Sequence, residues 1–129
     1  MILDTSVLIA IVKEEPEAAQ FALTLETSEV LRISAANYLE SSIVIDGVRN
    51  PKLSARLDEI LERARVIVEP VTPEQARIAR HAYRDYGKGS GHRANLNFGD
   101  CFAYALARVK REPLLYKGDD FVHTDIRKA

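Results

Sequence analysis

The sequence predicts an α/β domain with a central parallel sheet, and three observations lead to this prediction. Short runs rich in Val, Ile and Leu alternate along the chain with longer segments that repeat apolar residues at helical spacing. The 129 residues suit one domain, and hydrophobic (47%) and charged (29%) fractions are those of an ordinary globular core. Strands alternating with helices are typical of a parallel sheet built from right-handed crossovers. We therefore expect one domain over residues 1–129.

Four apolar runs are the expected strands, and turn signals bound each of them. They cover residues 1–3, 30–33, 66–68 and 114–116. Short unbroken runs of this kind suit strands that are buried on both faces.

Helix-start and helix-stop residues delimit the segments between these strands. Asn50-Pro51 is an N-cap followed by a proline at the first helical position, and apolar residues then recur on one face as far as Ala64. Thr72-Pro73 starts the next helix, which should stop at Gly87, with an apolar stripe of Ala76, Ala79, Tyr83 and Tyr86. Further helices are expected from Pro16, over 35–48, and from Gly99 or Asp100 to about Lys110. The polar, glycine-rich segment 87–97 is the one clear flexible loop.

The composition excludes several classes of protein. Eighteen Lys and Arg against nineteen Asp and Glu give a net charge of -1, so affinity for nucleic acid has to come from a local patch. No apolar run approaches the roughly 18 residues of a membrane span, and Asp4 follows the first three residues where a signal peptide would continue. A single cysteine, Cys101, excludes an internal disulfide and a zinc site made of cysteines. We expect a cytoplasmic protein with no membrane partner.

Two acidic residues stand where ligand sites form in parallel-sheet proteins. Asp4 follows the first expected strand, and residues just beyond the carboxyl ends of such strands line the ligand crevice. Asp100 stands in the first turn of the last helix. Each also has a simpler interpretation, because Asp4 could only cap the next helix, and the helix dipole stabilises an acid in a first turn by about 0.3–1 kcal/mol.

Glu40 and the pair Asp119-Asp120 extend this set of acids. Glu40 shares a helical face with Ile43 and Val44, and because an unpaired buried carboxylate is costly, it should reach either solvent or a partner. Asp119 and Asp120 follow the last strand, in a loop that on its own would suit a solvated turn. One shared site accounts for all these positions better than four coincidences do.

Clustered carboxylates need a counter-charge, because they otherwise repel one another and some take up a proton near neutral pH. Oxygen ligands without His or Cys at metal-binding spacing favour a hard cation, Mg²⁺ with Mn²⁺ as a substitute, over zinc. Mg²⁺ keeps water ligands, which leaves room for a phosphate oxygen and an attacking water. The pattern therefore predicts phosphodiester hydrolysis.

Together these residues resemble a known family. Asp-Thr-Ser-Val-Leu at 4–8, Glu40, Gly99-Asp100 at the start of a late helix, and Lys-Gly-Asp-Asp-Phe at 117–121 resemble the PIN-domain nucleases. The short length and the order of elements resemble, more narrowly, the VapC ribonuclease toxins of VapBC toxin–antitoxin pairs. The resemblance covers the whole chain and implies a PIN-like α/β/α sandwich, with a central parallel sheet of four to five short strands that brings the acids together at one edge.

The resemblance assigns roles residue by residue. Asp4 and Asp100 match the principal metal ligands, and Glu40 matches the acid in the helix after the second strand, which also serves the metal. Thr5 or Ser6 matches the small hydroxyl residue that accompanies the first acid.

The fourth acid has two candidates. Many relatives carry an Asp in the loop after the last strand, often just before a Phe. Gly118 occupies one position where an acid is common, which leaves Asp119 and Asp120 as rival catalytic residues. Asp120 is the better match because Phe121 follows it.

The implied activity is metal-dependent endonucleolytic cleavage of RNA. A metal-activated water attacks in line and leaves a 5′-phosphate and a 3′-hydroxyl. The glycines of the 87–97 loop would let it adapt to folded or single-stranded RNA. The candidate substrate-binding residues are Ser6, Lys88, His92, Arg93 and Lys117, with Lys13 close enough to join them.

Three partners follow from the resemblance. They are an RNA substrate, with tRNA and rRNA as candidate classes, a VapB-like antitoxin whose C-terminal segment obstructs the acidic site, and a second copy in a homodimer. The apolar stripes over 53–61 and on the helix from Pro16 offer surface for such contacts, although packing against the sheet is their ordinary explanation.

Two other functions compete with this one. A magnesium-dependent phosphatase of the haloacid-dehalogenase type also places an Asp after the first strand, but here Ser6 stands where that class has its second Asp. A non-catalytic, receiver-like module would use the acidic pocket only to hold an ion. Receivers pair two acids early in the chain, whereas Asp4 has no acidic neighbour.

Overall fold

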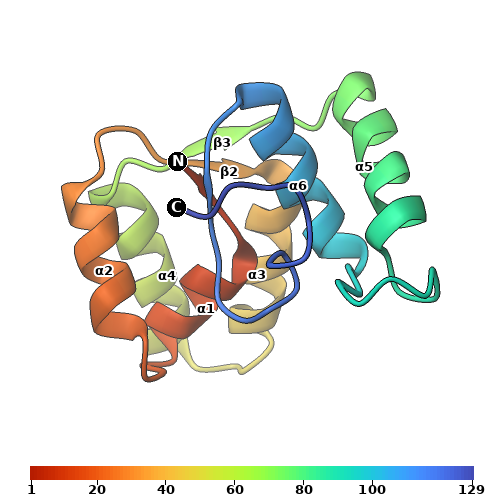
Figure 1. Ribbon diagram of the computed structural model, residues 1–129. Coiled ribbons are helices and arrows are strands. Elements are labelled where there is room, and N and C mark those ends of the chain that lie inside the picture. Colours follow the sequence, from red (N-terminus) through yellow and green to blue (C-terminus); the bar gives the residue numbers. More distant parts are fainter.

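The computed structural model describes all residues from 1 to 129 as short strands joined by helices (Figure 1). The strands are β1 (Ile2–Leu3), β2 (Arg32–Ser34), β3 (Ile67–Glu69) and β4 (Leu114–Leu115). The helices are α1 (Thr5–Val12), α2 (Ala18–Thr27), α3 (Ala35–Asp46), α4 (Pro51–Arg63), α5 (Pro73–Tyr86) and α6 (Phe98–Lys110). None of the helices is long and apolar enough to cross a membrane.

The strands form one parallel sheet in the order β3-β2-β1-β4. Ile2 of β1 lies opposite Arg32 of β2 on one side and Leu114 of β4 on the other. The predicted α/β class with a parallel sheet is therefore confirmed, with the lower of the two strand numbers expected. Because β1 lies inside the sheet and α1 follows it directly, Asp4 is placed at the carboxyl end of a central strand.

Helices cover both faces of the sheet and enclose two hydrophobic cores. Ile2 and Leu114 pack on the side of α5 and α6, whereas the adjacent Leu3 and Leu115 pack on the side of α1, α2 and α4. This alternation follows from the two-residue period of a strand. Figure 1 shows the same division, with α1, α2 and α4 on one side and α5 and α6 on the other. Each fully buried aliphatic side chain contributes about 1.5–3 kcal/mol to the free energy of unfolding.

The predicted caps form, with small shifts of helix ends. The side chains of Asn50 and Thr72 accept hydrogen bonds from the first turns of α4 and α5, and α5 ends at the predicted Gly87. The second helix starts at Ala18, after a turn that contains Pro16, and the last starts at Phe98 because Asn97 caps it.

Several expectations about burial are wrong. Strand β3 is not buried on both faces, because it is the edge of the sheet and leaves Ile67 and Val68 exposed. In α5, Ala79 and Tyr86 of the predicted stripe pack into the core, but between them Ala82 is buried and the predicted Tyr83 is exposed. A run of small and amphipathic residues defines the phase of a helix poorly.

The two stripes offered as contact surface pack mainly into the core. Leu57 of α4 is buried, as are Phe21 and Leu25 of α2, and they belong to the core under α1. The glycine-rich loop 87–97 is also partly anchored, because its end is paired with its start through Leu96, which is buried.

Candidate active site

Asp4 occupies the carboxyl end of β1 and is buried, with 5% of its surface exposed. Its carboxylate caps α1, where Oδ2 accepts hydrogen bonds from the Ser6 backbone N–H (3.0 Å) and from Ser6 Oγ (2.6 Å). Ser6 Oγ in turn accepts the backbone N–H of Lys117 (2.9 Å), which ties β1 to the loop after β4. Asp4 is thus both the helix cap that one interpretation predicted and a member of the site described below.

Glu40 reaches the same place from α3. Thr5 Oγ1 donates to Glu40 Oε1 (2.5 Å), so adjacent hydroxyl residues of α1 hold the carboxylates of Asp4 and Glu40. Gly99 of α6 lies on the other side of Glu40, and a Cβ at this glycine would overlap the carboxylate. The Glu40 side chain is therefore confined between α1 and α6.

Asp100 comes from the first turn of α6 and completes a capping box. Its Oδ2 accepts the Asn97 backbone N–H (3.0 Å), while its own N–H donates to Asn97 Oδ1 (2.9 Å). Only 7% of Asp100 is exposed. The Asn-x-x-Asp spacing is the signal in the sequence that would have placed the helix start at Phe98.

The pKa values of two carboxyl groups show that the acids lie close enough to repel one another. Burial raises the pKa of Asp4 despite the hydrogen bonds from Ser6, and the charge of Glu40 adds to this effect. The pKa of Asp100 is raised to about 7, mainly by burial and also by the charges of Asp4 and Asp120, while the hydrogen bond from Asn97 opposes the rise. Four acids from four parts of the chain therefore converge.

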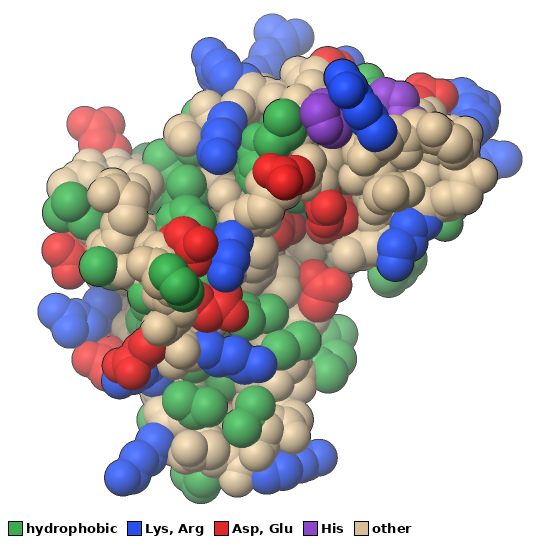
Figure 2. Space-filling view, turned by 60° about the horizontal axis from the view of Figure 1, so that its bottom comes forward, with side chains coloured by type: hydrophobic (Ala, Val, Ile, Leu, Met, Phe, Trp, Pro, Cys, Tyr) green, Lys and Arg blue, Asp and Glu red, His purple; other side chains and the backbone are tan.

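The structure distinguishes the two candidates for the fourth acid. The charge of Asp120 acts on the Asp100 carboxyl and helps to raise its pKa. Asp119 instead lies near Tyr116 and, after burial, helps to raise the pKa of that phenol. Asp120 is thus the one brought to Asp100. Figure 2 shows acidic side chains around a hollow in the middle of one face.

Asn37 is a member of the site that sequence reasoning missed. It is fully buried in α3, and its Nδ2 donates to the Gly99 carbonyl (2.9 Å) and lies 3.4 Å from Glu40 Oε1. This side chain joins α3 to the start of α6, next to both Glu40 and Asp100. No motif spacing marks it, because the Gly99 carbonyl that it binds is far away in sequence.

The candidate substrate-binding residues fall into two groups, and the first consists of side chains that already have partners within the chain. Lys117 Nζ is shared between Glu15 (2.9 Å) and Glu17 (3.1 Å), so a phosphate would have to compete for its charge. His92 packs edge-on against Tyr86 and accepts the Ala94 backbone N–H at Nδ1 (3.1 Å).

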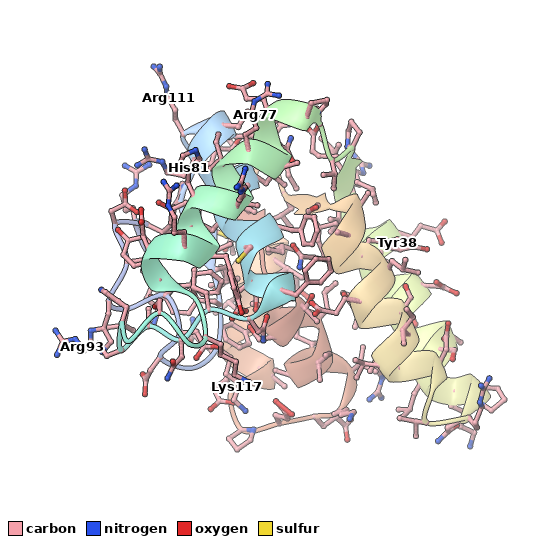
Figure 3. The ribbon with its side chains drawn as sticks, turned by 90° about the vertical axis from the view of Figure 1, so that its right-hand side faces the viewer. Tyr38, Arg77, His81, Arg93, Arg111 and Lys117 are labelled. Carbon is pink, nitrogen blue, oxygen red and sulfur yellow. The ribbon has the colours of Figure 1, made fainter.

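The second group consists of cations that are free of acidic partners. Lys88, Arg93 and Lys13 are exposed and form no ion pair. Arg93 extends outward from the 87–97 loop (Figure 3). These side chains are free to meet a polyanion.

The donor set suits a hard divalent cation. All four converging side chains offer carboxylate oxygens. The charges that shift the pKa values of Asp4 and Asp100 are those of other acids, so the cluster carries uncompensated negative charge. The side chains do not form a ready site in which three of them hold one ion. A cation that keeps much of its water shell, as Mg²⁺ does, can be bound by such a set partly through water.

Comparisons with known proteins identify the family and the fold. Residues 1–127 match the PIN domain family. Ribonuclease VapC28 of Mycobacterium tuberculosis is 57% identical over 129 residues, which cover 100% of this chain and 97% of that protein. The fold is that of the M. tuberculosis toxin VapC20, described as cleaving the sarcin-ricin loop (TM-score 0.79, 16% identity, 99% and 97% of the two chains). It is also that of a chain in a toxin–antitoxin complex from Klebsiella pneumoniae (TM-score 0.70, 21% identity, 96% and 92% covered).

Proposed function

This chain belongs to the PIN-domain family and, within it, to the VapC ribonuclease toxins, and from that premise we propose that its four converging acids cleave RNA by metal-assisted hydrolysis. The observation that carries the proposal is the convergence itself. Asp4, Glu40, Asp100 and Asp120 come from four segments, and burial and mutual repulsion raise the pKa of Asp4 and Asp100. Such a cluster is costly unless a cation neutralises it.

Asp4, Glu40 and Asp100 would hold the metal, directly or through water, with Asp120 beside Asp100. We propose Mg²⁺ as the ion, with Mn²⁺ as a substitute, because every donor is an oxygen atom. When bound, such an ion lowers the pKa of a water molecule and polarises the scissile phosphate.

The chain's own residues fix where this chemistry takes place. Ser6 and the backbone of Asn97 orient the carboxylates of Asp4 and Asp100, while Thr5 and Gly99 confine that of Glu40. Because these supports belong to helix starts, the oxygen atoms are held at the ends of α1 and α6 before substrate arrives. Preorganised charge of this kind requires little rearrangement during the reaction.

The test compares two substrates with and without Mg²⁺. Purified protein should cleave RNA in Mg²⁺, and this cleavage should stop in excess EDTA. The protein should leave p-nitrophenyl phosphate intact. Mapping the cut ends should show 5′-phosphates. Cleavage that persists in EDTA would contradict the metal mechanism, whereas phosphomonoester turnover without RNA cleavage would favour the phosphatase alternative.

We propose that a groove between α2 and α4 is the binding site for an antitoxin segment. It has a volume of about 710 Å³, an apolar floor that includes Ala22 and Ile60, and a rim with charges of both signs such as Glu26 and Arg63. An amphipathic helix fits a groove of this type. Ala22→Glu should weaken neutralisation by a VapB-like antitoxin while leaving RNA cleavage intact.

An exposed apolar stripe on α3 is our candidate for the homodimer contact. Leu39 and Ile43 are one helical turn apart and are 57% and 62% exposed, with Tyr38 beside them. Apolar side chains that gather on one face commonly mark protein contacts.

We place the activity in the cytoplasm, because the substrate is RNA and the free Cys101 suits a reducing compartment.

A further inference from the structure

An apolar pocket lies beside the acid cluster, between α5 and the start of α6. Its volume is about 480 Å³. Its walls include Ala76 and Tyr83 of α5 together with Phe98 and Phe102 of α6, and Arg80 and Lys88 also line it. We call it the α5–α6 pocket. The proposed reaction leaves this pocket unused.

The aromatic rings of the α5–α6 pocket are unusually open to solvent. Phe98 is 78% exposed although it begins a helix, and Tyr83 is 45% exposed. Phe98 packs edge-on against Phe102, with ring centroids 4.8 Å apart and planes at 85°. Proteins bind unpaired RNA bases by stacking them on aromatic side chains. Phe98 therefore offers a stacking surface that the fold itself does not use.

The charges around the α5–α6 pocket suit a polyanion. Residues 73–97 carry five basic and two acidic side chains, whereas the rest of the chain carries thirteen basic and seventeen acidic ones. Arg80 and Lys88 form no ion pair, and Arg77 points outward on the same helix (Figure 3). Although the net charge of the chain is -1, residues 73–97 form a basic region, and some of its cations have no ion-pair partner. Burying such cations against an apolar protein surface would be costly, whereas phosphates would pair with them.

The α5–α6 pocket and the acid cluster share a residue. Asn97 lines the pocket, caps α6, and donates its backbone N–H to Asp100 Oδ2. Phe98 precedes Asp100 by two positions, about 3 Å along the helix axis but about 200° around it, so the pocket and the acid cluster lie on opposite sides of the start of α6. Asn97 joins these two sides, and an unpaired strand that passes around the start of α6 with one phosphate at the acids can place a neighbouring base in the pocket.

We propose that the α5–α6 pocket binds one unpaired base of the RNA substrate next to the scissile phosphate. Phe98 stacks on the base, and Arg80 and Lys88 contact the flanking phosphates. The proposal rests on the ribonuclease function proposed above and names the part of the substrate that the site recognises, a single-stranded nucleotide rather than a paired one.

The experiment measures binding of two labelled probes by fluorescence anisotropy in EDTA, where cleavage should not occur. One probe is a short unstructured RNA, and the other is a ribose-phosphate strand of the same length without bases. Phe98→Ala should weaken binding of the RNA by roughly 5- to 150-fold, the loss expected for one base–aromatic stack, and should leave binding of the abasic strand unchanged. Phe98→Trp should restore RNA binding. Arg80→Gln should weaken binding of both probes, because phosphates are common to them.

Lys52→Gln on α4 is the matched control, since Lys52 is an exposed cation without an ion-pair partner on the other side of the sheet. It should change neither affinity. Equal losses for both probes with Phe98→Ala, or no loss for either, would overturn the proposal. The proposal would also fail if the wild type sediments as a dimer and the Phe98→Ala variant as a monomer, because the pocket would then be a contact between two copies of the chain.

Cleavage assays separate this proposal from the ribonuclease function. In Mg²⁺, Phe98→Ala should raise KM for RNA and leave hydrolysis of bis(p-nitrophenyl) phosphate, which has no base, unaffected. If the wild-type protein cleaves RNA and Phe98→Ala does so with unchanged KM, only the base pocket is wrong. If the wild-type protein cleaves no RNA in Mg²⁺, the proposed function itself fails.

Discussion

Gly99 of α6 lies so close to Glu40 of α3 that a single Cβ atom at position 99 would overlap the Glu40 carboxylate. Gly99→Ala should therefore displace Glu40 and lower RNA cleavage, and should cost about 1 kcal/mol or less of the free energy of unfolding, because the end of a flexible side chain can shift. Urea denaturation and initial cleavage rates measure both effects.

A double-mutant cycle tests whether Glu40 is the cause. The stability cost of Gly99→Ala should largely disappear in a Glu40→Ala background, because the shortened side chain leaves room for the new methyl group. An undiminished cost in that background would mean that some other contact of Gly99 is responsible.

Sequence reasoning predicted the acid cluster because its members stand at element ends, whose meeting place a parallel sheet determines. Asp4 follows a central strand and Asp100 starts a helix, so the topology alone brings them to one edge. The contact of Gly99 with Glu40 and the hydrogen bond from Asn37 to the Gly99 carbonyl could not be predicted, because they depend on the rotation of α3 about its axis. The residues expected beside Glu40, Ile43 and Val44, are exposed.

The fourth acid can be assigned with a matched pair of variants. Asp120→Asn should reduce cleavage by about 10- to 100-fold, the range seen when a residue that supports a metal ligand is lost, because Asp120 acts directly on Asp100. Asp119→Asn should stay within about twofold of the wild-type rate, since the charge of Asp119 acts on Tyr116 and is not among those that raise the pKa of Asp100. A larger loss with Asp119→Asn than with Asp120→Asn would reverse the assignment.

The raised pKa of Asp100 predicts that the metal-free protein loses stability as the pH rises. The folded state holds the proton up to about pH 7, whereas the unfolded chain releases it near the ordinary value of 3.8. The stabilisation is thus complete below pH 3.8 and disappears as the pH rises through about 7.

The measurement compares urea denaturation of the wild type and Asp100→Asn at about pH 5 and about pH 8, with and without Mg²⁺. Between these values the metal-free wild type should lose about 2–4 kcal/mol more than the variant. Mg²⁺ should stabilise the wild type mainly at the higher pH, because it binds the ionised carboxylates. Equal pH dependence in both proteins would refute the raised pKa.

Ser6 and Lys117 should differ sharply in their effect on cleavage. Ser6→Ala removes the hydroxyl that donates to Asp4 and accepts the Lys117 backbone N–H, and should cost about 10- to 100-fold in kcat. Lys117→Gln keeps that backbone contact and loses only a side chain already shared between Glu15 and Glu17. It should change kcat by less than about threefold, because the charge that is removed is already paired with these two acids and not with the acid cluster. A large loss with Lys117→Gln would show that its charge serves the substrate after all.

The α3 stripe predicts the oligomeric state. Ile43→Asp places a charge in the centre of the exposed apolar turn formed with Leu39, and should convert a dimer into a monomer in sedimentation velocity. Because Ile43 is 62% exposed, the substitution should leave the fold intact, which circular dichroism can verify. A wild-type protein that is monomeric at every concentration would remove the dimer and leave the stripe available to another partner.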